Sequence, residues 1–581
     1  MSRSAWRTTP LSIAAAALAT FAVGAFAAGG AVPERIPQLG EASPGPLVGS
    51  CEALATSAAG LANTVITGST TVPAGTLLVA GQPIAEHCRV TGRMFDRVSP
   101  VDGNAYAISF EMRLPKAWNG RFFHQGNGGI DGSVVTATGS FGGGPLTNAL
   151  LQGFAVLSSD AGHSGSLGPA FGLDPQARLD YGYQAVGKLT PMAKQMVGLA
   201  YGRGPDRSYF GGCSNGGRHT LVAAARHPEA YDGFLAGAPG FHLPLAALAN
   251  IFGAQRYASV TTGDPTTPPG LETAFTAAER KTLANAVLAR CDALDGATDG
   301  LVQDTAACQK AFSFARDVPT CPGARDGSCL TKEQKIAIAP IFNGAMTSTG
   351  ERFYAPFPFD SGIGGGGIPF WEFTAPLVLD SGAVGVIFKV PPSTLALTNG
   401  PAFSLGLDID QALAELYATD ATFTEAAMTF MTPPNEDNLS ALRRRGAKVL
   451  VYQGVSDPIF SIADTERWYR RLGPGSGGKA QDFARVFPVP GMGHCSGGPA
   501  TDQADYLTPL VAWVEHGTAP ASIVASARGA GNPGGVNAEV PANWSPNRTR
   551  PLCPYPAVAR YSGQGDPELA ASWQCVKGQE D

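Results

Sequence analysis

The 581-residue sequence lacks several features that would place it in other functional classes. It has no glycine-rich phosphate loop ending in Gly-Lys-Ser or Gly-Lys-Thr and no stripe of basic residues, so neither a nucleotide nor a nucleic acid is an expected partner. Charged residues make up only 15% of the chain, and the net charge of −6 indicates no polyanionic partner. Beyond the N-terminus, no segment is long and apolar enough to cross a bilayer.

The N-terminus carries the one long apolar run. It extends from Leu11 to Phe26 after two arginines and ends in the small-residue pattern Ala25-Phe26-Ala27. These features are typical of a secretory signal peptide and predict residues 1–27 as a signal removed on export. An uncleaved anchor, the alternative, usually needs about 20 apolar residues. No cysteine follows closely enough for a lipoprotein, so we predict a periplasmic or secreted protein without membrane contact after cleavage.

No Cys-x-x-Cys pair is present, so neither a redox-active dithiol nor a thiolate metal site is predicted. The ten cysteines, an even number in an exported protein, instead favour disulfides. Ten cysteines permit many connectivities, and free buried cysteines are the alternative, so the pairing rests on proximity along the chain. The spacings suggest four pairs of near neighbours, which leave Cys213 and Cys495 for each other: Cys51 with Cys88, Cys291 with Cys308, Cys321 with Cys329, and Cys553 with Cys575.

Short apolar runs bounded by glycine or proline recur along the chain, and helical stretches separate them. The run from Tyr106 to Met112 alternates apolar and polar residues, whereas residues 154–158 are mostly apolar. Strands separated by helices predict an α/β fold with a mostly parallel sheet. The other expected strands are residues 120–123, 208–211, 233–236, 448–452 and 485–489.

The middle of the chain has a different sequence pattern. From Phe241 to Arg445 it contains amphipathic stretches, a cysteine-bounded loop, a glycine-rich tract and proline-rich turns, without regular alternation of strands and helices. We predict an inserted lid domain at residues 241–445, between the two parts of a catalytic domain at residues 28–240 and 446–581. The insertion is expected to cover the strand ends where an active site would lie.

Three segments supply the residue types of a serine hydrolase. Gly212-Cys213-Ser214-Asn215-Gly216 matches Gly-x-Ser-x-Gly between an expected strand and a helical stretch at residues 218–227, the setting of a nucleophile elbow. The pentapeptide alone is a weak signal, because glycine and serine are common in tight turns. Asp457 and His494 each follow a later expected strand, and the order Ser, Asp, His is that of the α/β-hydrolases. A Cys213–Cys495 bond would place Ser214 beside His494, since bonded cysteines have Cα atoms roughly 4.4–6.8 Å apart.

Backbone N–H groups near Ser214 can stabilise the oxyanion that forms when a serine attacks a carbonyl. The N–H of Asn215 directly follows the predicted nucleophile. A second donor is expected in the glycine-rich loop His124–Gly129, where side chains would block close approach to a substrate. A simple flexible turn explains the composition of this loop equally well.

The segment from Cys291 to Leu301 concentrates carboxylates. Asp292, Asp295 and Asp299 are three and four residues apart, and glycines between them permit sharp turns. Crowded carboxylates repel one another unless they are neutralised, so we predict a calcium ion in a structural role. The spacing is not that of an EF-hand, and a polar Asp-Gly turn is the alternative.

Longer stretches make the sequence resemble the tannase and feruloyl esterase family over nearly the whole mature chain. They are residues 118–123, 171–178, 212–217, 231–233, 291–300 and 490–499. The resemblance implies an ester hydrolase with an α/β-hydrolase core and a lid. For this chain it implies a triad of Ser214, Asp457 and His494, the Cys213–Cys495 disulfide, oxyanion N–H groups of Gly129 and Asn215, and calcium held by Asp292, Asp295, Asp299 and the carbonyls of Ala297 and Leu301.

The lid departs from the pattern of relatives that cleave terephthalate monoesters. Those enzymes hold the free carboxylate of the substrate with an arginine, but the corresponding stretch here, Val378 to Val384, has none. A buried carboxylate without a cationic partner is costly, which favours a neutral aromatic acyl group unless Lys389 substitutes. Trp371, Phe370 and Phe460 are candidate walls for the aromatic ring, with ordinary core packing as the alternative.

The sequence therefore predicts a monomeric, exported serine esterase whose partner is a small aromatic ester of the hydroxycinnamate, gallate or terephthalate type. Two alternatives stay open. The first is an enzyme specific for mono(2-hydroxyethyl) terephthalate, and the second is a non-catalytic, calcium-stabilised periplasmic binding protein.

Overall fold

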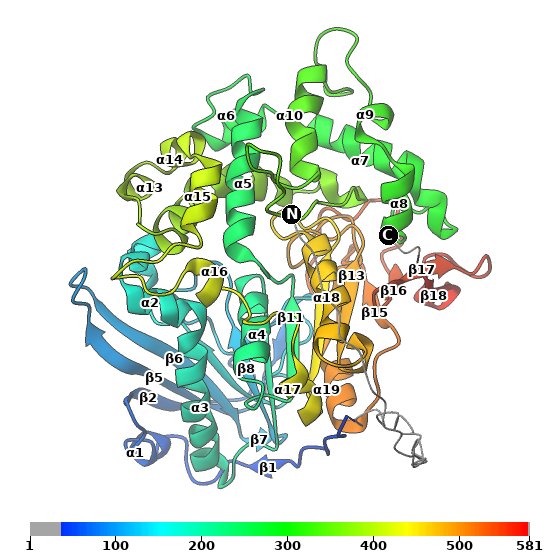
Figure 1. The fold of residues 1–581 in the computed structure, drawn as a ribbon. Coiled ribbons are helices and arrows are strands. Elements are labelled where there is room, and N and C mark those ends of the chain that lie inside the picture. The colour runs from blue at the N-terminus through cyan, green and yellow to red at the C-terminus, as the bar shows by residue number, and fades with distance from the viewer. Residues whose placement is uncertain (1–35, 579–581) are drawn as a thin grey trace, which may run out of the picture. The chain divides into compact units, whose positions relative to one another are not determined.

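The computed structural model describes residues 36–578, and the predicted signal peptide at residues 1–27 lies outside them. Nine strands form a central sheet in the order β13-β12-β11-β10-β8-β9-β6-β5-β2 (Figure 1). The strands from β13 to β9 are parallel, and β6, β5 and β2 extend the sheet by antiparallel pairing. The strand bounds are β2 Thr64–Val72, β5 His87–Val98, β6 Ala105–Pro115, β8 Arg121–Gly126, β9 Ala155–Ser159, β10 Arg207–Cys213, β11 Gly233–Gly237, β12 Lys448–Gly454 and β13 Ala484–Val489.

All seven expected strands belong to this sheet, which confirms the α/β fold. The alternation expected in β6 is also confirmed, because Tyr106, Ile108, Phe110 and Met112 are buried. Strands β2 and β5 were not expected. No residue of β2 is fully buried, so β2 has no apolar stripe. In β5, Cys88, Val90 and Met94 are buried and arginines occupy exposed positions, so its alternation is a signal that sequence reasoning missed.

Helices cover the sheet and bury its central strands. In Figure 1, α3 (Ala185–Tyr201) and α4 (Asn215–Arg226) cross in front of the strands. The helix α19 (Leu507–His516) packs in an apolar cluster with side chains of β10, β11 and β12, among them Tyr209, Leu235 and Leu450. Every residue of β9, β11 and β12 is buried. The carboxyl ends of these strands are therefore anchored in a rigid core.

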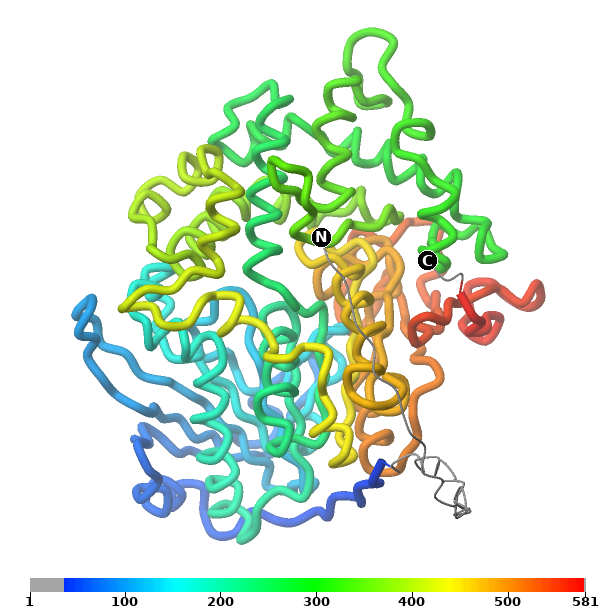
Figure 2. Tube along the Cα trace, viewed as in Figure 1, coloured from blue at the N-terminus to red at the C-terminus, as the bar shows by residue number. Residues whose placement is uncertain are grey.

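Between β11 and β12 the described chain forms helices and contributes no strand to the central sheet. Most of this segment lies above the sheet in Figure 1, and Figure 2 traces it from green to yellow. The expected two-domain division stays a prediction, since one apolar cluster joins Leu248 of this segment to Phe171 and Phe460 outside it. The helix bounds are α5 Leu243–Ala258, α6 Pro268–Glu272, α7 Ala277–Cys291, α8 Thr305–Ala311, α9 Phe314–Asp317, α10 Lys332–Phe342, α11 Ala375–Val378, α12 Asp380–Gly382, α13 Thr394–Thr398, α14 Gly400–Gly406, α15 Ile409–Glu415, α16 Ala427–Phe430 and α17 Ser440–Arg445.

The helix α18 (Ile462–Gly475) connects β12 to β13, and after β13 the chain adds two small sheets. These sheets consist of β14 (Gln503–Ala504), β15 (Ile523–Ser526) and β16 (Thr549–Leu552), and of β17 (Ala557–Tyr561) and β18 (Trp573–Lys577). Within residues 36–578 no single helix has the length and apolarity to cross a membrane, although the bent pair at residues 369–378 and 380–388 meets both criteria when taken together.

Candidate active site

Ser214 occupies a sharp turn between the end of β10 and the start of α4. Its φ of 64° and ψ of −128° lie in a region that residues other than glycine rarely adopt. Glycines on both sides let the turn approach the neighbouring loop, because a Cβ added at Gly212 or Gly216 would lie 2.3 Å from the carbonyl oxygen of Gly126. The strand, turn and helix expected around this serine are confirmed.

His494 lies between Ser214 and Asp457. Its Nε2 is 2.8 Å from Ser214 Oγ, and its Nδ1 is 2.9 Å from Asp457 Oδ2. The other carboxylate oxygen of Asp457 accepts the backbone N–H groups of Ile459 and Phe460, at 3.1 and 3.0 Å, which fixes the carboxylate. When the Asp457 carboxylate accepts a hydrogen bond from Nδ1–H, Nε2 is left to accept a hydrogen bond from the serine hydroxyl. Three residues distant in sequence thus meet beyond the ends of β10, β12 and β13.

Asp360, from the segment between β11 and β12, forms hydrogen bonds to both loops that carry Asp457 and His494. Its Oδ2 accepts the Ser456 hydroxyl and the Gly491 N–H, both at 2.7 Å. The side chain is fully buried, and this burial raises its pKa above the usual value for aspartate. No motif marks Asp360 in the sequence, because its partners are 96 and 131 residues away.

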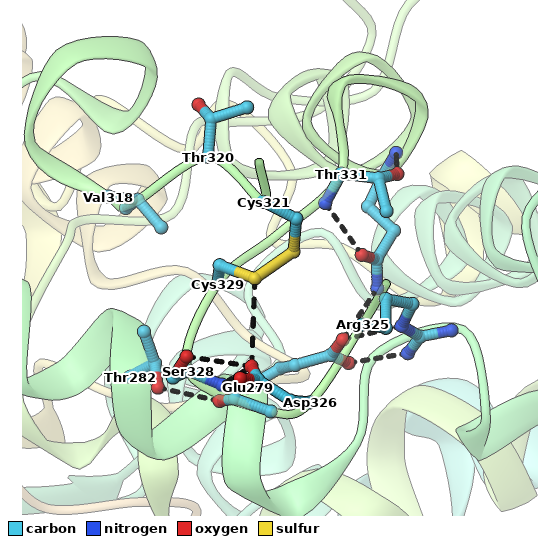
Figure 3. Close-up of a disulfide and its surroundings, with 12 residues drawn as sticks. Glu279, Thr282, Val318, Thr320, Cys321, Arg325, Asp326, Ser328, Cys329 and Thr331 are labelled. Carbon is cyan, nitrogen blue, oxygen red and sulfur yellow. Dashed lines mark hydrogen bonds and ion pairs between the residues drawn. A yellow bond between two sulfur atoms is a disulfide. The ribbon is translucent and has the colours of Figure 1, made fainter. Parts of the chain in front are cut away.

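A disulfide joins Cys213, the residue before Ser214, to Cys495, the residue after His494. Their Cα atoms are 6.0 Å apart although 282 positions separate them in sequence. The four other expected pairs are also confirmed, and residues 36–578 contain no free cysteine. Figure 3 shows the Cys321–Cys329 disulfide, which closes a short loop whose Arg325 pairs with Glu279 of α7. Five disulfides are typical of a protein that folds in an oxidising compartment.

The glycine-rich loop after β8 lies against Ser214. A Cβ added at Gly128 would be 3.7 Å from the Ser214 Cβ, and Gly129 has a φ of 63°. Gly129 and Asn215 line the same cavity as Ser214. Both residues expected to supply oxyanion N–H groups therefore lie beside the serine, and their role in stabilising an oxyanion stays a prediction.

A buried network connects this glycine loop to α4. Asp131 Oδ2 is 2.8 Å from the Asn215 Nδ2 and 2.8 Å from the His219 Nε2, and Arg218 Nε donates to Asn215 Oδ1 at 2.6 Å. Burial raises the pKa of Asp131 to about 7, and burial together with Arg218 lowers the pKa of His219 well below its usual value. The network fixes Asn215 relative to the loop of Gly129. No sequence motif marks Asp131, because its partners on α4 are 84 and 88 positions away.

Two of the three aromatic residues predicted as pocket walls, Trp371 and Phe460, contact the histidine. The third, Phe370, is exposed and does not line the cavity beside Ser214. The ring centroid of Trp371 is 4.8 Å from that of His494, and the ring centroid of Phe460 is 5.3 Å away. Both rings are nearly perpendicular to the imidazole and line the cavity beside Ser214. Core packing alone does not describe these positions, because their side chains bound the space that a substrate would enter.

Lys389, which could have replaced the missing lid arginine, is engaged elsewhere. Its ammonium group is 3.0 Å from the Glu415 carboxylate and donates to the Pro391 carbonyl at 3.0 Å. It is not among the residues that line the cavity beside Ser214. The described part of this cavity thus has no cationic side chain on its wall.

The carboxylates of the expected calcium loop are held mainly by backbone N–H groups. Asp295 is buried and accepts from Ala297 and Gln303 at 3.1 and 3.0 Å, whereas Asp299 pairs with Arg550. No ion pair joins Asp292 or Asp295 to a basic side chain among residues 36–578. In the same range, no three His, Cys, Asp or Glu side chains converge as metal ligands. Calcium therefore stays a prediction.

Comparisons with known proteins agree with the geometry. Residues 88–576 match the family model described as tannase and feruloyl esterase. The chain is 40% identical over 528 residues to mono(2-hydroxyethyl) terephthalate hydrolase of Piscinibacter sakaiensis, covering 85% of each chain. It is 29% identical over 484 residues to a probable feruloyl esterase B-1 of Aspergillus fumigatus, covering 80% of this chain and 82% of that one. The crystal structure of feruloyl esterase B from Aspergillus oryzae has a similar fold, with a TM-score of 0.71, 24% identity, and coverage of 91% of this chain and 100% of that one.

Proposed function

The chain belongs to the tannase and feruloyl esterase family and is a carboxylic ester hydrolase, and we propose that it cleaves aromatic esters with Ser214, His494 and Asp457 as its catalytic triad. The observation that carries the proposal is the hydrogen-bonded series from Asp457 through His494 to Ser214 Oγ, with distances of 2.9 and 2.8 Å. The five disulfides support the predicted export to the periplasm or beyond.

In the proposed mechanism, Ser214 Oγ forms a bond to the ester carbonyl carbon while its proton passes to His494 Nε2. Asp457 accepts a hydrogen bond from Nδ1–H and stabilises the resulting imidazolium. The N–H groups of Gly129 and Asn215 stabilise the negative charge on the carbonyl oxygen. His494 then gives the proton to the departing alcohol oxygen as the carbon–oxygen bond breaks. Water repeats the cycle on the acyl-enzyme, which releases the acid and regenerates Ser214.

The aromatic substrate class is supported by the rings of Trp371 and Phe460, which lie beside His494. The alternative of an enzyme specific for mono(2-hydroxyethyl) terephthalate is supported by the 40% identity to that hydrolase. The missing arginine and the engagement of Lys389 with Glu415 disfavour it, because the free carboxylate of this substrate would have no cationic partner.

A panel of aromatic esters tests the proposed function. Purified protein is incubated with methyl gallate, methyl ferulate, a nitrophenyl ester and mono(2-hydroxyethyl) terephthalate, and the released acid is quantified. We expect hydrolysis of at least one of these esters, with no release by the Ser214→Ala variant. A protein that bound an ester without any Ser214-dependent turnover would be a binding protein, and the esterase proposal would be wrong.

We also propose that the loop from Asp292 to Leu301 binds calcium as a structural ion. The support is the donor set, since Asp292 and Asp295 supply carboxylate oxygens without a basic ion-pair partner in the described chain and the carbonyls of Ala297 and Leu301 lie in the same loop. When bound, the ion would neutralise these carboxylates and would take no part in the reaction.

Removal of calcium is expected to lower the thermal stability of the protein. Treatment with EDTA should decrease Tm by roughly 3–5 °C, because an ion that binds only the folded state stabilises it. Differential scanning calorimetry would measure the change, and calcium but not magnesium should restore the original Tm. The Asp295→Asn variant should have the low Tm with or without calcium. An unchanged Tm in EDTA would leave the loop as an ordinary hydrogen-bonded turn.

A further inference from the structure

The cavity beside Ser214 has one carboxyl group on its wall among residues 36–578. Asp380, the first residue of α12, lines it together with Ser214, Trp371 and Phe460. Most other lining residues are apolar, such as Leu243 of α5 and Phe388. In an apolar pocket, a few placed polar groups determine which ligands bind. A single carboxyl group in this position is therefore a candidate for recognising the acyl part of the substrate.

The hydrogen bonding of Asp380 leaves it available to a ligand. Its Oδ2 accepts one hydrogen bond from Asn250 Nδ2 at 3.1 Å, and no ion pair joins it to a lysine or arginine in the described chain. No hydrogen bond connects it to Ser214, His494 or Asp457 among these residues. The residue is 4% exposed, and burial raises the pKa of its carboxyl to about 7. A buried carboxyl group with unused acceptor capacity favours a neutral hydrogen-bond donor.

We propose that Asp380 accepts a hydrogen bond from a phenolic hydroxyl on the acyl ring, and that it thereby selects hydroxylated aromatic esters over esters of aromatic dicarboxylic acids. This inference rests on the proposed function, because it assumes that the acyl ring lies between Trp371 and Phe460 while the ester carbon is at Ser214. A second carboxylate brought into the same cavity would face Asp380 without a neutralising cation, which is unfavourable in an apolar environment.

Three methyl esters isolate the contribution of Asp380: methyl 4-hydroxybenzoate, methyl benzoate and monomethyl terephthalate. The measured quantity is the ratio of kcat/KM for the hydroxylated ester to kcat/KM for methyl benzoate. The two esters differ in intrinsic reactivity, and this difference cancels when the ratio for a variant is compared with the ratio for the wild-type enzyme. We expect Asp380→Leu to lower the ratio by about tenfold or more, because the variant removes the hydrogen-bond acceptor. Asp380→Asn, which keeps the size of the side chain, should raise kcat/KM for monomethyl terephthalate relative to kcat/KM for methyl benzoate.

Glu372 offers a matched control. It is a half-buried residue eight positions earlier, and desolvation also raises the pKa of its carboxyl to about 7, but it does not line the cavity beside Ser214. Glu372→Gln should therefore leave the ratio unchanged. The inference is overturned if Asp380→Leu keeps the wild-type ratio while Ser214-dependent hydrolysis persists, or if the wild-type enzyme prefers monomethyl terephthalate. Absence of Ser214-dependent hydrolysis of all three esters would instead contradict the proposed function on which it rests.

Discussion

Replacing Ser214 with alanine should lower kcat for ester hydrolysis by about 10⁵-fold. The variant loses the oxygen of the proposed nucleophile, since Ser214 Oγ is the group that His494 Nε2 contacts at 2.8 Å. The oxyanion donors and the aromatic walls remain, so substrate affinity should change far less than turnover. Initial rates of acid release, followed by chromatography at several substrate concentrations, separate the two parameters.

Two controls make this result specific. Ser562→Ala, at an exposed serine of the C-terminal segment, should retain full activity. Circular dichroism should give the same spectrum for Ser214→Ala and the wild-type protein, because the substitution removes one oxygen atom. Retention of more than a few per cent of wild-type kcat by a folded Ser214→Ala variant would show that another group is the nucleophile.

Double replacement of Cys213 and Cys495 by alanine should lower kcat by about a hundredfold and change KM much less. The disulfide connects the neighbours of Ser214 and His494, and its Cα atoms are 6.0 Å apart. Without it, only the loop contacts hold the serine and histidine within hydrogen-bonding distance, and a misplacement of about 1 Å can cost a hundredfold in rate. Rates should be measured at a temperature where both proteins are folded, since the bond also constrains the unfolded chain.

The Cys321–Cys329 disulfide provides the comparison. It closes a loop of eight positions in the segment between β11 and β12, and its surroundings include none of the triad residues (Figure 3). Its double alanine variant should keep the wild-type kcat while losing some thermal stability. If the Cys213 and Cys495 variant also kept full turnover, the bond would contribute to stability alone.

The central strands could be predicted from the sequence because they are buried on both faces and therefore appear as short apolar runs. Strands β9, β11 and β12 are entirely buried, and all three were expected. The edge strand β2 could not be predicted in this way, because none of its residues is fully buried and it pairs only with β5 in the described sheet.

The triad positions could be predicted because each lies just after a strand and the order of the three residue types is distinctive. Asp360 could not, since its two hydrogen-bond partners belong to loops far away in sequence. Asp131 and Asp380 are comparable cases. Each is an isolated aspartate in its segment, and its significance depends on which side chains the fold brings around it.

The position of Asp360 has a consequence for protein engineering. Exchanging the segment between β11 and β12 with that of a relative is an obvious route to new substrate ranges, because this segment supplies Trp371 and Asp380 to the cavity. The same exchange would also replace the carboxylate that binds Ser456 and Gly491. A chimera would therefore inherit the donor's specificity only if the graft kept an aspartate at position 360, or if its junction were placed to retain that residue from the host.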